Sequence, residues 1–310
     1  MTKRRILIVV DGSHQSIETV NYVSSVLEPE GTEIVLLHIM SSVPEEFWDL
    51  EKQPGWQQKV QVVKTWEFQM RQSIECCMEK AQQVLIEEGF SEKSVKIDIR
   101  ARREGIARDI TRLAHSDSYD CLIIGRRGFS TIKDLSIGST ANKIASSATD
   151  FSMMLVGGRP EPSGVIIGID SSDGSMLAVD HVAKVFDRPG TKVLLLHVIR
   201  STGGVGAKSS GGEDLPKRWT DLAENKIEPV MQRAADKLLS SGFSPENILT
   251  KVITGATTRA GSIMEQAKTG GYGTIVVGRR GISSVEKFSM GRVSANIVQA
   301  AKDRAVCIVG

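Results

Sequence analysis

Residues 8–13 read Ile-Val-Val-Asp-Gly-Ser, and residues 167–172 read Ile-Gly-Ile-Asp-Ser-Ser. Each stretch ends an apolar run with an aspartate, and the second lies 159 positions after the first, from 8 to 167. A Gly-Thr pair followed by an apolar run that contains one histidine repeats at the same offset, in residues 31–39 and 190–198. Coincidence cannot hold one offset over so many positions, so the chain contains a duplication.

A third matched pair fixes the extent of the repeat. Residues 123–128, Ile-Ile-Gly-Arg-Arg-Gly, return as Val-Val-Gly-Arg-Arg-Gly at 276–281, an offset of 153 from 123 to 276. A chain of 310 residues suits two domains of about 150 residues each. We therefore predict one domain over residues 1–157 and a second over 164–310. The two prolines in the short join between them should keep the domains close together.

Each copy reads as alternating strands and helices. Short apolar strands joined by helices predict a parallel sheet that is covered on both faces, because every parallel crossover needs a connection long enough for a helix. The fold class is therefore α/β, with two tandem doubly wound five-stranded parallel-sheet domains. The predicted strands are near 5–10, 33–40, 95–100, 120–125 and 152–156 in copy one, and near 164–169, 192–199, 248–253, 273–278 and 305–309 in copy two.

One helix is predicted in detail, over roughly residues 64–88. Its apolar positions form one stripe at helical spacing, and Gly89 is placed to end the helix in the left-handed conformation. The stripe comprises Trp66, Met70, Ile74, Cys77, Ala81, Val84 and Leu85.

The candidate site follows the fourth strand of copy one. Gly125 and Gly128 are separated by two residues, and Gly138 follows after nine more, directly before Ser139 and Thr140. Glycine lets the backbone approach a ligand closely, and free N–H groups at a helix start favour an anion. In an open parallel sheet ligands bind beyond the carboxyl ends of the strands. The pattern predicts a phosphate cradle at that edge.

The spacing Gly-x2-Gly-x9-Gly-Ser resembles the ATP-site signature of the universal stress protein family, whose fold is Rossmann-like and similar to that of the adenine-nucleotide alpha hydrolases. The Asp-Gly-Ser at 11–13 and the Leu-Leu-His-Ile at 36–39 belong to the same pattern, and the resemblance covers both copies. It implies ATP, AMP or ADP as the ligand, with Mg²⁺. It also implies that Asp11 lies beside the nucleotide and that Ile39 contacts adenine. The phosphate-binding residues it implies are Gly125, Gly128, Gly138, Ser139 and Thr140.

Copy two departs from this pattern at the start of its last helix. Arg292 stands where copy one has Ser139, and it could either pair with phosphate or fill the cradle. In copy one, Ala141 replaces the second hydroxyl that Ser294 supplies in copy two. The equivalent site residues of copy two are Asp170, Val198, Gly278, Gly281, Gly291, Arg292, Val293 and Ser294.

Both glycine turns contain two arginines, Arg126 and Arg127 in copy one and Arg279 and Arg280 in copy two. Charge-assisted hydrogen bonds to phosphate would be favourable along this path. We expect one arginine of each pair to contact phosphate and the other to point into solvent, and the sequence does not say which.

The composition of the chain argues against several classes of partner and cofactor. A formal net charge of +2 argues against a protein that coats nucleic acid. No apolar run approaches the ~18 residues that span a bilayer. The four cysteines have no disulfide or zinc spacing, and we interpret Cys121 and Cys307 as small buried apolar residues. His14, His115 and His181 have no partners at metal-binding spacing. A reducing, cytoplasmic location is expected.

Neither copy shows an assignable nucleophile and base, so dedicated catalysis is not expected, although a weak ATPase activity is compatible with the site. The first hypothesis is an ATP-binding regulatory protein of the stress response. The alternatives are a scaffold that binds no nucleotide and acts through protein partners, and an enzyme such as an adenylyl transferase. The last strands of the two copies are expected to pair, giving an internal pseudo-dimer, with homodimerisation also possible.

Two segments outside the repeat remain open. Residues 201–209 resemble a P-loop but lack its glycines, so a flexible loop over the site is expected. The insertion of copy one, with Phe47, Trp48, Trp56 and Trp66, is either a lid or interaction surface, or packs against its own domain.

Overall fold

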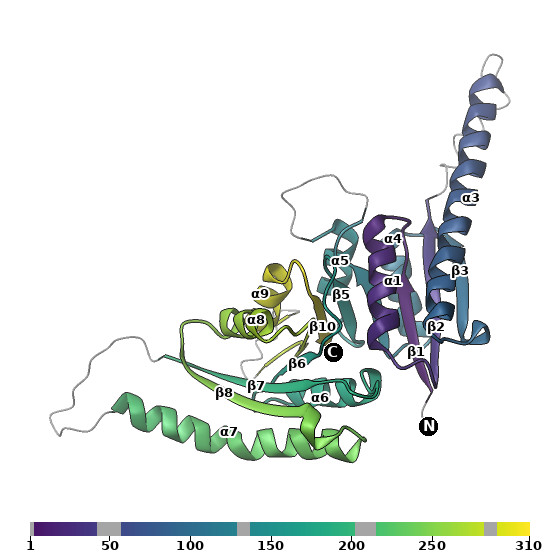
Figure 1. Cartoon of the computed structure of the whole chain (residues 1–310). Helices are drawn as coiled ribbons and strands as arrows, with labels where there is room; N and C mark the ends of the chain where they lie inside the picture. Colours follow the sequence, from purple (N-terminus) through teal and green to yellow (C-terminus); the bar gives the residue numbers. More distant parts are fainter. Residues whose placement is uncertain (1–2, 42–56, 129–136, 202–214, 282–289) are drawn as a thin grey trace.

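A computed structural model describes residues 3–41, 57–128, 137–201, 215–281 and 290–310. Residues 42–56 and 202–214 lie outside the described residues. They hold most of the two segments that were left open, so those two expectations stay predictions. The described parts form two α/β halves that share a single sheet (Figure 1).

All of the predicted strands are present. Most of their ends lie within two residues of the predicted bounds. Each half has the strand order 3-2-1-4-5 with parallel neighbours, which confirms the doubly wound fold. The strands are β1 (Arg4–Val9), β2 (Thr32–Met40), β3 (Val95–Ala101), β4 (Cys121–Gly125), β5 (Met153–Val156), β6 (Val165–Gly168), β7 (Val193–Arg200), β8 (Ile248–Ala256), β9 (Thr274–Gly278) and β10 (Ala305–Val309).

The two halves join edge to edge through their last strands. β5 and β10 pair antiparallel, with Met154 opposite Cys307 and Val156 opposite Ala305. This pairing makes one ten-stranded sheet in the order β3-β2-β1-β4-β5-β10-β9-β6-β7-β8. It confirms the internal pairing of the last strands, and it leaves neither apolar edge open to aggregation. We call this contact the β5–β10 seam.

Helices cover both faces of the sheet. The side chains of successive strand residues point to opposite faces, so Ile6 and Ile8 lie in one apolar core while Leu7 and Val9 lie in the other. The first core is closed by α1 (His14–Val26), α3 (Gln57–Glu87), α6 (Asp173–Val185) and α7 (Leu215–Ser240). The second is closed by α4 (Ile106–Ser116), α5 (Ser139–Ser147), α8 (Arg259–Thr269) and α9 (Arg292–Ala300).

Helix α3 differs from its prediction at its N-terminal end. It ends where expected, with Gly89 at a φ of 99°, but it begins at Gln57 and projects beyond the sheet (Figure 1). Its 31 residues span about 46 Å, whereas a typical strand spans about 20 Å. The sheet therefore covers only the C-terminal part of the helix, and Ala81 and Leu85 are fully buried. Trp66 and Met70 lie on the same stripe in the projecting part of the helix, and they are 49% and 39% exposed.

None of the helices in the described residues combines the length and the apolar character that crossing a bilayer requires. The two longest, α3 and α7, carry charged residues throughout.

Candidate functional site

The turn after β1 places the carboxylate of Asp11 at the carboxyl edge of the sheet. Its Oδ1 accepts hydrogen bonds from the Ser13 N–H at 2.9 Å and from the Ser13 hydroxyl at 2.6 Å. Ser13 in turn caps helix α1 by accepting from the N–H of Ser16. The carboxylate is therefore held in one orientation by the same residue that starts the helix.

The first glycine turn lies directly against this carboxylate. A Cβ atom added at Gly128 would stand 2.1 Å from Asp11 Oδ2, so only glycine fits without moving the aspartate. Copy two repeats the contact, with 2.6 Å between a Cβ at Gly281 and Asp170 Oδ2. The main chain of the turn and the strand-end carboxylate thus form one surface in each half.

The two glycine turns are joined to each other. The Gly138 N–H donates to the Arg126 carbonyl oxygen at 2.8 Å, and a Cβ at Gly138 would lie 3.9 Å from the Gly128 nitrogen. In copy two the Gly291 N–H donates to the Arg279 carbonyl oxygen at 2.9 Å. The structure therefore brings Asp11, Gly128 and Gly138 together, as the spacing predicted.

Helix α5 begins at this junction, with Gly138 as its N-cap. The Asn142 N–H is the first to bond within the helix, to the Gly138 carbonyl oxygen, so the N–H groups of residues 139–141 have no partner within it. Ser139 is exposed and Thr140 half-buried. Free N–H groups, the positive end of the helix dipole and two hydroxyls make this helix start suited to an anion.

Gly125 and Gly278 have a different role from the expected close approach to a ligand. A Cβ at Gly278 would stand 2.5 Å from the main chain of Gly174 in α6, and one at Gly125 would stand 3.2 Å from the Thr19 hydroxyl in α1. These two glycines allow a helix to pack closely on the end of the strand. They therefore contribute to the site by positioning the strand end, and not by contact with a ligand.

Arg126 and Arg279 do not line the phosphate path that the sequence suggested. Both are buried, and each crosses the seam: Arg126 Nη2 donates to the Gln299 carbonyl oxygen at 2.9 Å and Arg279 Nη2 to the Ala145 carbonyl oxygen at 2.6 Å. Burial, with the neighbouring Arg127, lowers the pKa of Arg126 to about 10, so it stays protonated at neutral pH. Burial likewise lowers the pKa of Arg279. Arg127 and Arg280 are exposed beside the turns.

Ser294 also points inward. Its hydroxyl is buried and donates to the Gly278 carbonyl oxygen at 2.8 Å, so it fastens helix α9 to strand β9 and is not directed at a ligand. The substitution of this hydroxyl by Ala141 in copy one therefore removes a structural hydrogen bond and no ligand contact. In copy two, Arg292 is exposed and Val293 half-buried at the start of α9.

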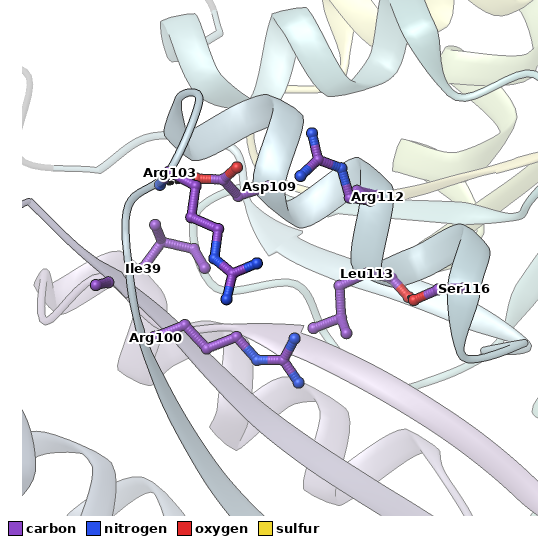
Figure 2. A pocket seen from close by; sticks show the side chains of 8 residues that line it. Ile39, Arg100, Arg103, Asp109, Arg112, Leu113 and Ser116 are labelled. Carbon is purple, nitrogen blue, oxygen red and sulfur yellow. Dashed lines mark hydrogen bonds between the residues drawn. The ribbon is translucent and has the colours of Figure 1, made fainter.

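A cavity of about 420 Å³ lies beside Ile39, at the end of β2 (Figure 2). Figure 2 shows Arg100 and Arg103 reaching toward the same space. Asp109 accepts from the N–H groups of Arg103 at 2.8 Å and Glu104 at 3.2 Å. Burial alone would raise the pKa of Asp109, but these backbone hydrogen bonds lower it. The other lining residues are Ala101, Arg112, Leu113 and Ser116.

The equivalent place in copy two is occupied differently. Val198 is the counterpart of Ile39, and the Arg259 Nε donates to its carbonyl oxygen at 3.2 Å. Copy one has Ile106 at the position of Arg259, 153 residues earlier. The end of β2 is therefore free of this cationic side chain, whereas the end of β7 is crossed by it.

Comparison with known proteins gives the family. The sequence profile described as the universal stress protein family matches residues 3–155 and again residues 164–307. This chain belongs to the universal stress protein family. A universal stress protein of Mycolicibacterium smegmatis is 22% identical over 305 residues, covering 97% of this chain and 95% of the relative.

Solved structures of universal stress proteins are also similar to this chain. One from Archaeoglobus fulgidus superposes with a TM-score of 0.58 at 16% identity, covering 100% of this chain and 99% of that chain. Another, solved in complex with cAMP, is 22% identical and covers 48% of this chain and 97% of its own, with a TM-score of 0.36.

Two histidines of this universal stress protein, one in each copy, bond to the main chain at the end of a neighbouring strand. His38 Nδ1 donates to the Val10 carbonyl oxygen at 2.7 Å, and His197 Nδ1 to the Ile169 carbonyl oxygen at 2.7 Å. Each ties the second strand of its half to the end of the first. Arg100, Arg103 and Arg259 could not be predicted as site residues from the sequence, because their approach to the strand ends depends on how β3 and α8 pack.

Proposed function

We propose that this universal stress protein binds an adenine nucleotide, ATP in the first instance, and acts as a regulatory protein with slow or no hydrolysis. Residues 1–157 and 164–310 would be its two domains. The observation that carries the proposal is the contact of Asp11 with Gly128 and of Gly128 with Gly138, beside the free N–H groups of helix α5.

The site fits a nucleotide in its chemistry. The phosphates would lie on the main chain of Gly128 and Gly138 and on the hydroxyls of Ser139 and Thr140, with Arg127 as the exposed cation of the turn. The adenine would lie at Ile39, next to the cavity. Asp11 is a carboxylate beside the phosphates, and Mg²⁺ would offset the repulsion between them.

Copy one is proposed as the principal site. Copy two lacks both hydroxyls at its helix start, and Arg259 lies across the end of β7. We expect slow or no hydrolysis because neither copy has an assignable nucleophile and general base at its glycine turns.

Isothermal titration of the full chain with ATP and Mg²⁺ tests the proposal, with adenosine and GTP as comparison ligands. We expect one molecule of ATP per chain and weaker binding of both comparison ligands. No heat of binding with ATP, ADP or AMP at millimolar ligand would overturn it.

Exchange of the differing residues between the copies gives a matched pair of variants. Ser139→Arg with Thr140→Val should abolish the ATP site, because copy one then has the helix start of copy two. Arg292→Ser with Val293→Thr and Arg259→Ile should create a second site. Since residues 139, 292 and 259 are at least partly exposed at helix starts, both proteins should fold like the wild type. Unchanged stoichiometry in both variants would place the nucleotide elsewhere.

A second function, a scaffold that acts through protein partners, is favoured by one observation. The projecting part of α3 exposes Val62, Trp66 and Phe68, which are 68%, 49% and 60% accessible. Exposed apolar side chains gathered on one element are typical of protein contact surfaces. Freshly purified protein that releases no nucleotide on denaturation, and that binds none in titration, would favour this function over the first.

A further inference from the structure

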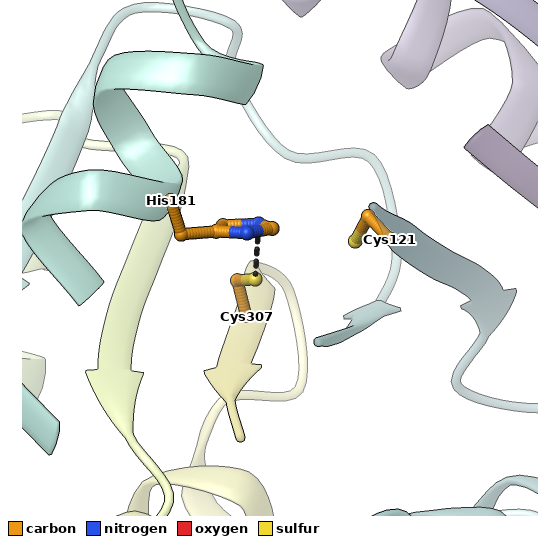
Figure 3. Close-up of side chains that lie close together, drawn as sticks. All are labelled: Cys121, His181 and Cys307. Atoms are coloured by element: carbon orange, nitrogen blue, oxygen red, sulfur yellow. Dashed lines mark hydrogen bonds between the residues drawn. The ribbon is translucent and has the colours of Figure 1, made fainter. Parts of the chain in front are cut away.

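Two cysteines and a histidine meet in the core next to the β5–β10 seam. Cys121 lies on β4 of copy one, Cys307 on β10 of copy two, and His181 on α6 of copy two. The two Sγ atoms and one imidazole nitrogen all lie within 4.8 Å of one another (Figure 3). One pair, Cys307 Sγ and His181 Nε2, is 3.3 Å apart. All three side chains are buried, with exposed fractions of 1%, 0% and 8%.

The two cysteines cannot form a disulfide in this arrangement. Met154 of β5 pairs with Cys307 on one side and with Ile123 of β4 on the other, so a whole strand separates the two cysteines. Neighbouring strands are about 4.8 Å apart, which places β4 and β10 about 9.6 Å apart. Cysteine Cα atoms more than about 7 Å apart cannot be bridged without moving the backbone. The thiols face a common point but cannot cross-link.

Two thiolates and an imidazole are ligands that soft cations prefer. Zinc–sulfur bonds are about 2.3 Å and zinc–nitrogen bonds about 2.0 Å, so ligand atoms around one zinc ion lie about 3.5 to 4 Å apart. The spacings in the cluster need to change only slightly to reach these values. Hard cations such as Mg²⁺ and Ca²⁺ prefer oxygen ligands, and this cluster offers none.

The surroundings add a charge argument. Ile123, Met154 and Val276 belong to the same apolar core as both cysteines. A net charge is costly in such a place, whereas two thiolates and one divalent cation carry none together. Zn²⁺ satisfies this condition, whereas Cu⁺ would leave one net negative charge and is favoured only by its preference for thiolates.

We propose that Cys121, His181 and Cys307 form a binding site for a thiophilic cation, Zn²⁺ or Cu⁺, that fastens the two halves of the chain to each other. The ligands come from both copies, so the bound ion adds a link between strand β4 of the first half and β10 and α6 of the second. Binding to the folded chain only would stabilise it against unfolding. The site is separate from the glycine turns and does not depend on nucleotide binding.

A chain with Cys76→Ala and Cys77→Ala provides the test. Cys76 is exposed and Cys77 half-buried on helix α3, so this protein should fold normally and keeps only the two buried thiols. The reduced protein is brought to equilibrium with Co²⁺, a spectroscopic probe of zinc sites, and separately with Cu⁺ against a competing chelator. We expect one ion per chain, sulfur-to-cobalt charge-transfer absorption and displacement of Co²⁺ by Zn²⁺.

Single changes in the same background assign the ligands. Cys307→Ala and His181→Ala should each weaken binding at least 100-fold, whereas His14→Ala, which alters an exposed histidine, should leave it unchanged. Added Zn²⁺ should raise the Tm of the parent and not that of the Cys307→Ala protein. Cu⁺ binding without Zn²⁺ binding would identify the ion as Cu⁺. No ion bound by the parent, or unaltered binding after Cys307→Ala, would overturn the proposal, and the first result needs no ligand variant to fold.

Discussion

The guanidinium group of Arg126 lies 2.9 Å from the main-chain carbonyl oxygen of Gln299, although 173 positions separate the two residues. Gln299 is in the last turn of α9, and Arg279 makes the mirror contact with Ala145 in the last turn of α5. A cation at a helix C-terminus is favoured by the helix dipole and by the free carbonyl groups there. Each glycine turn is thereby attached to the opposite half of the molecule.

Replacement of Arg126 should therefore lower stability. We expect Arg126→Met to reduce the free energy of unfolding by about 2 kcal/mol, because the buried, charge-assisted hydrogen bond from its guanidinium group to the Gln299 carbonyl oxygen is lost. Urea unfolding followed by circular dichroism measures the change. Arg127→Met is the control, since Arg127 is exposed and its replacement should change the free energy of unfolding by less than about 0.5 kcal/mol. Equal effects of the two substitutions would contradict the assignment.

In nucleotide binding the same two variants should have effects in the opposite order, with the larger loss of ATP affinity for Arg127→Met. Arg127→Met should weaken ATP about 5- to 10-fold and leave adenosine unaffected, because an exposed cation beside the turn contacts phosphate only. Arg126→Met should change the affinity for ATP less than 2-fold, provided that it is measured well below its Tm. Titration calorimetry with both ligands measures these affinities. A larger loss of ATP affinity for Arg126→Met than for Arg127→Met would show that Arg126 contacts phosphate.

The supporting glycines should differ between the copies. Gly278→Ala should cost about 2 to 3 kcal/mol of unfolding free energy, because the new methyl group meets the main chain of Gly174 at 2.5 Å. Gly125→Ala should cost about 1 kcal/mol, since its nearest neighbours include the movable side chains of Gln15 and Thr19 at 3.2 Å. Urea unfolding of both variants provides the comparison. A cost at Gly125 as large as that at Gly278 would show that the strand–helix contact is equally close in both halves.

Helix α3 should tolerate polar substitution in its projecting part. Trp66→Gln is expected to change the free energy of unfolding by less than about 0.5 kcal/mol, because the side chain is half exposed and away from the sheet. Leu85→Ala, in the fully buried part of the same helix, should cost about 2 to 4 kcal/mol. If Trp66→Gln destabilised the chain by more than about 1 kcal/mol in urea unfolding, then this end of α3 would be packed against another part of the protein.

Most of the architecture could be predicted because it depends on local sequence patterns. Strand alternation, crossover helices and the duplicated Gly-Arg-Arg-Gly turns depend on neighbouring residues, and each appears twice in the sequence. The contact among Asp11, Gly128 and Gly138 was also predictable, since the carboxyl ends of parallel strands share one edge of the sheet. The extent of burial on α3 was not, because helical spacing says which residues share a stripe and not how far the sheet reaches.

The sequence by itself determined the duplication, the doubly wound halves and the set of residues at each glycine turn. Only the tertiary structure decided which arginine of each pair is buried, that Ser294 faces inward, and that Cys121, His181 and Cys307 converge. The physical reason is sequence separation. Local spacing fixes the periodicity of an element, whereas Arg126 and Gln299, or Cys121 and Cys307, meet only when the two last strands pair and close the sheet.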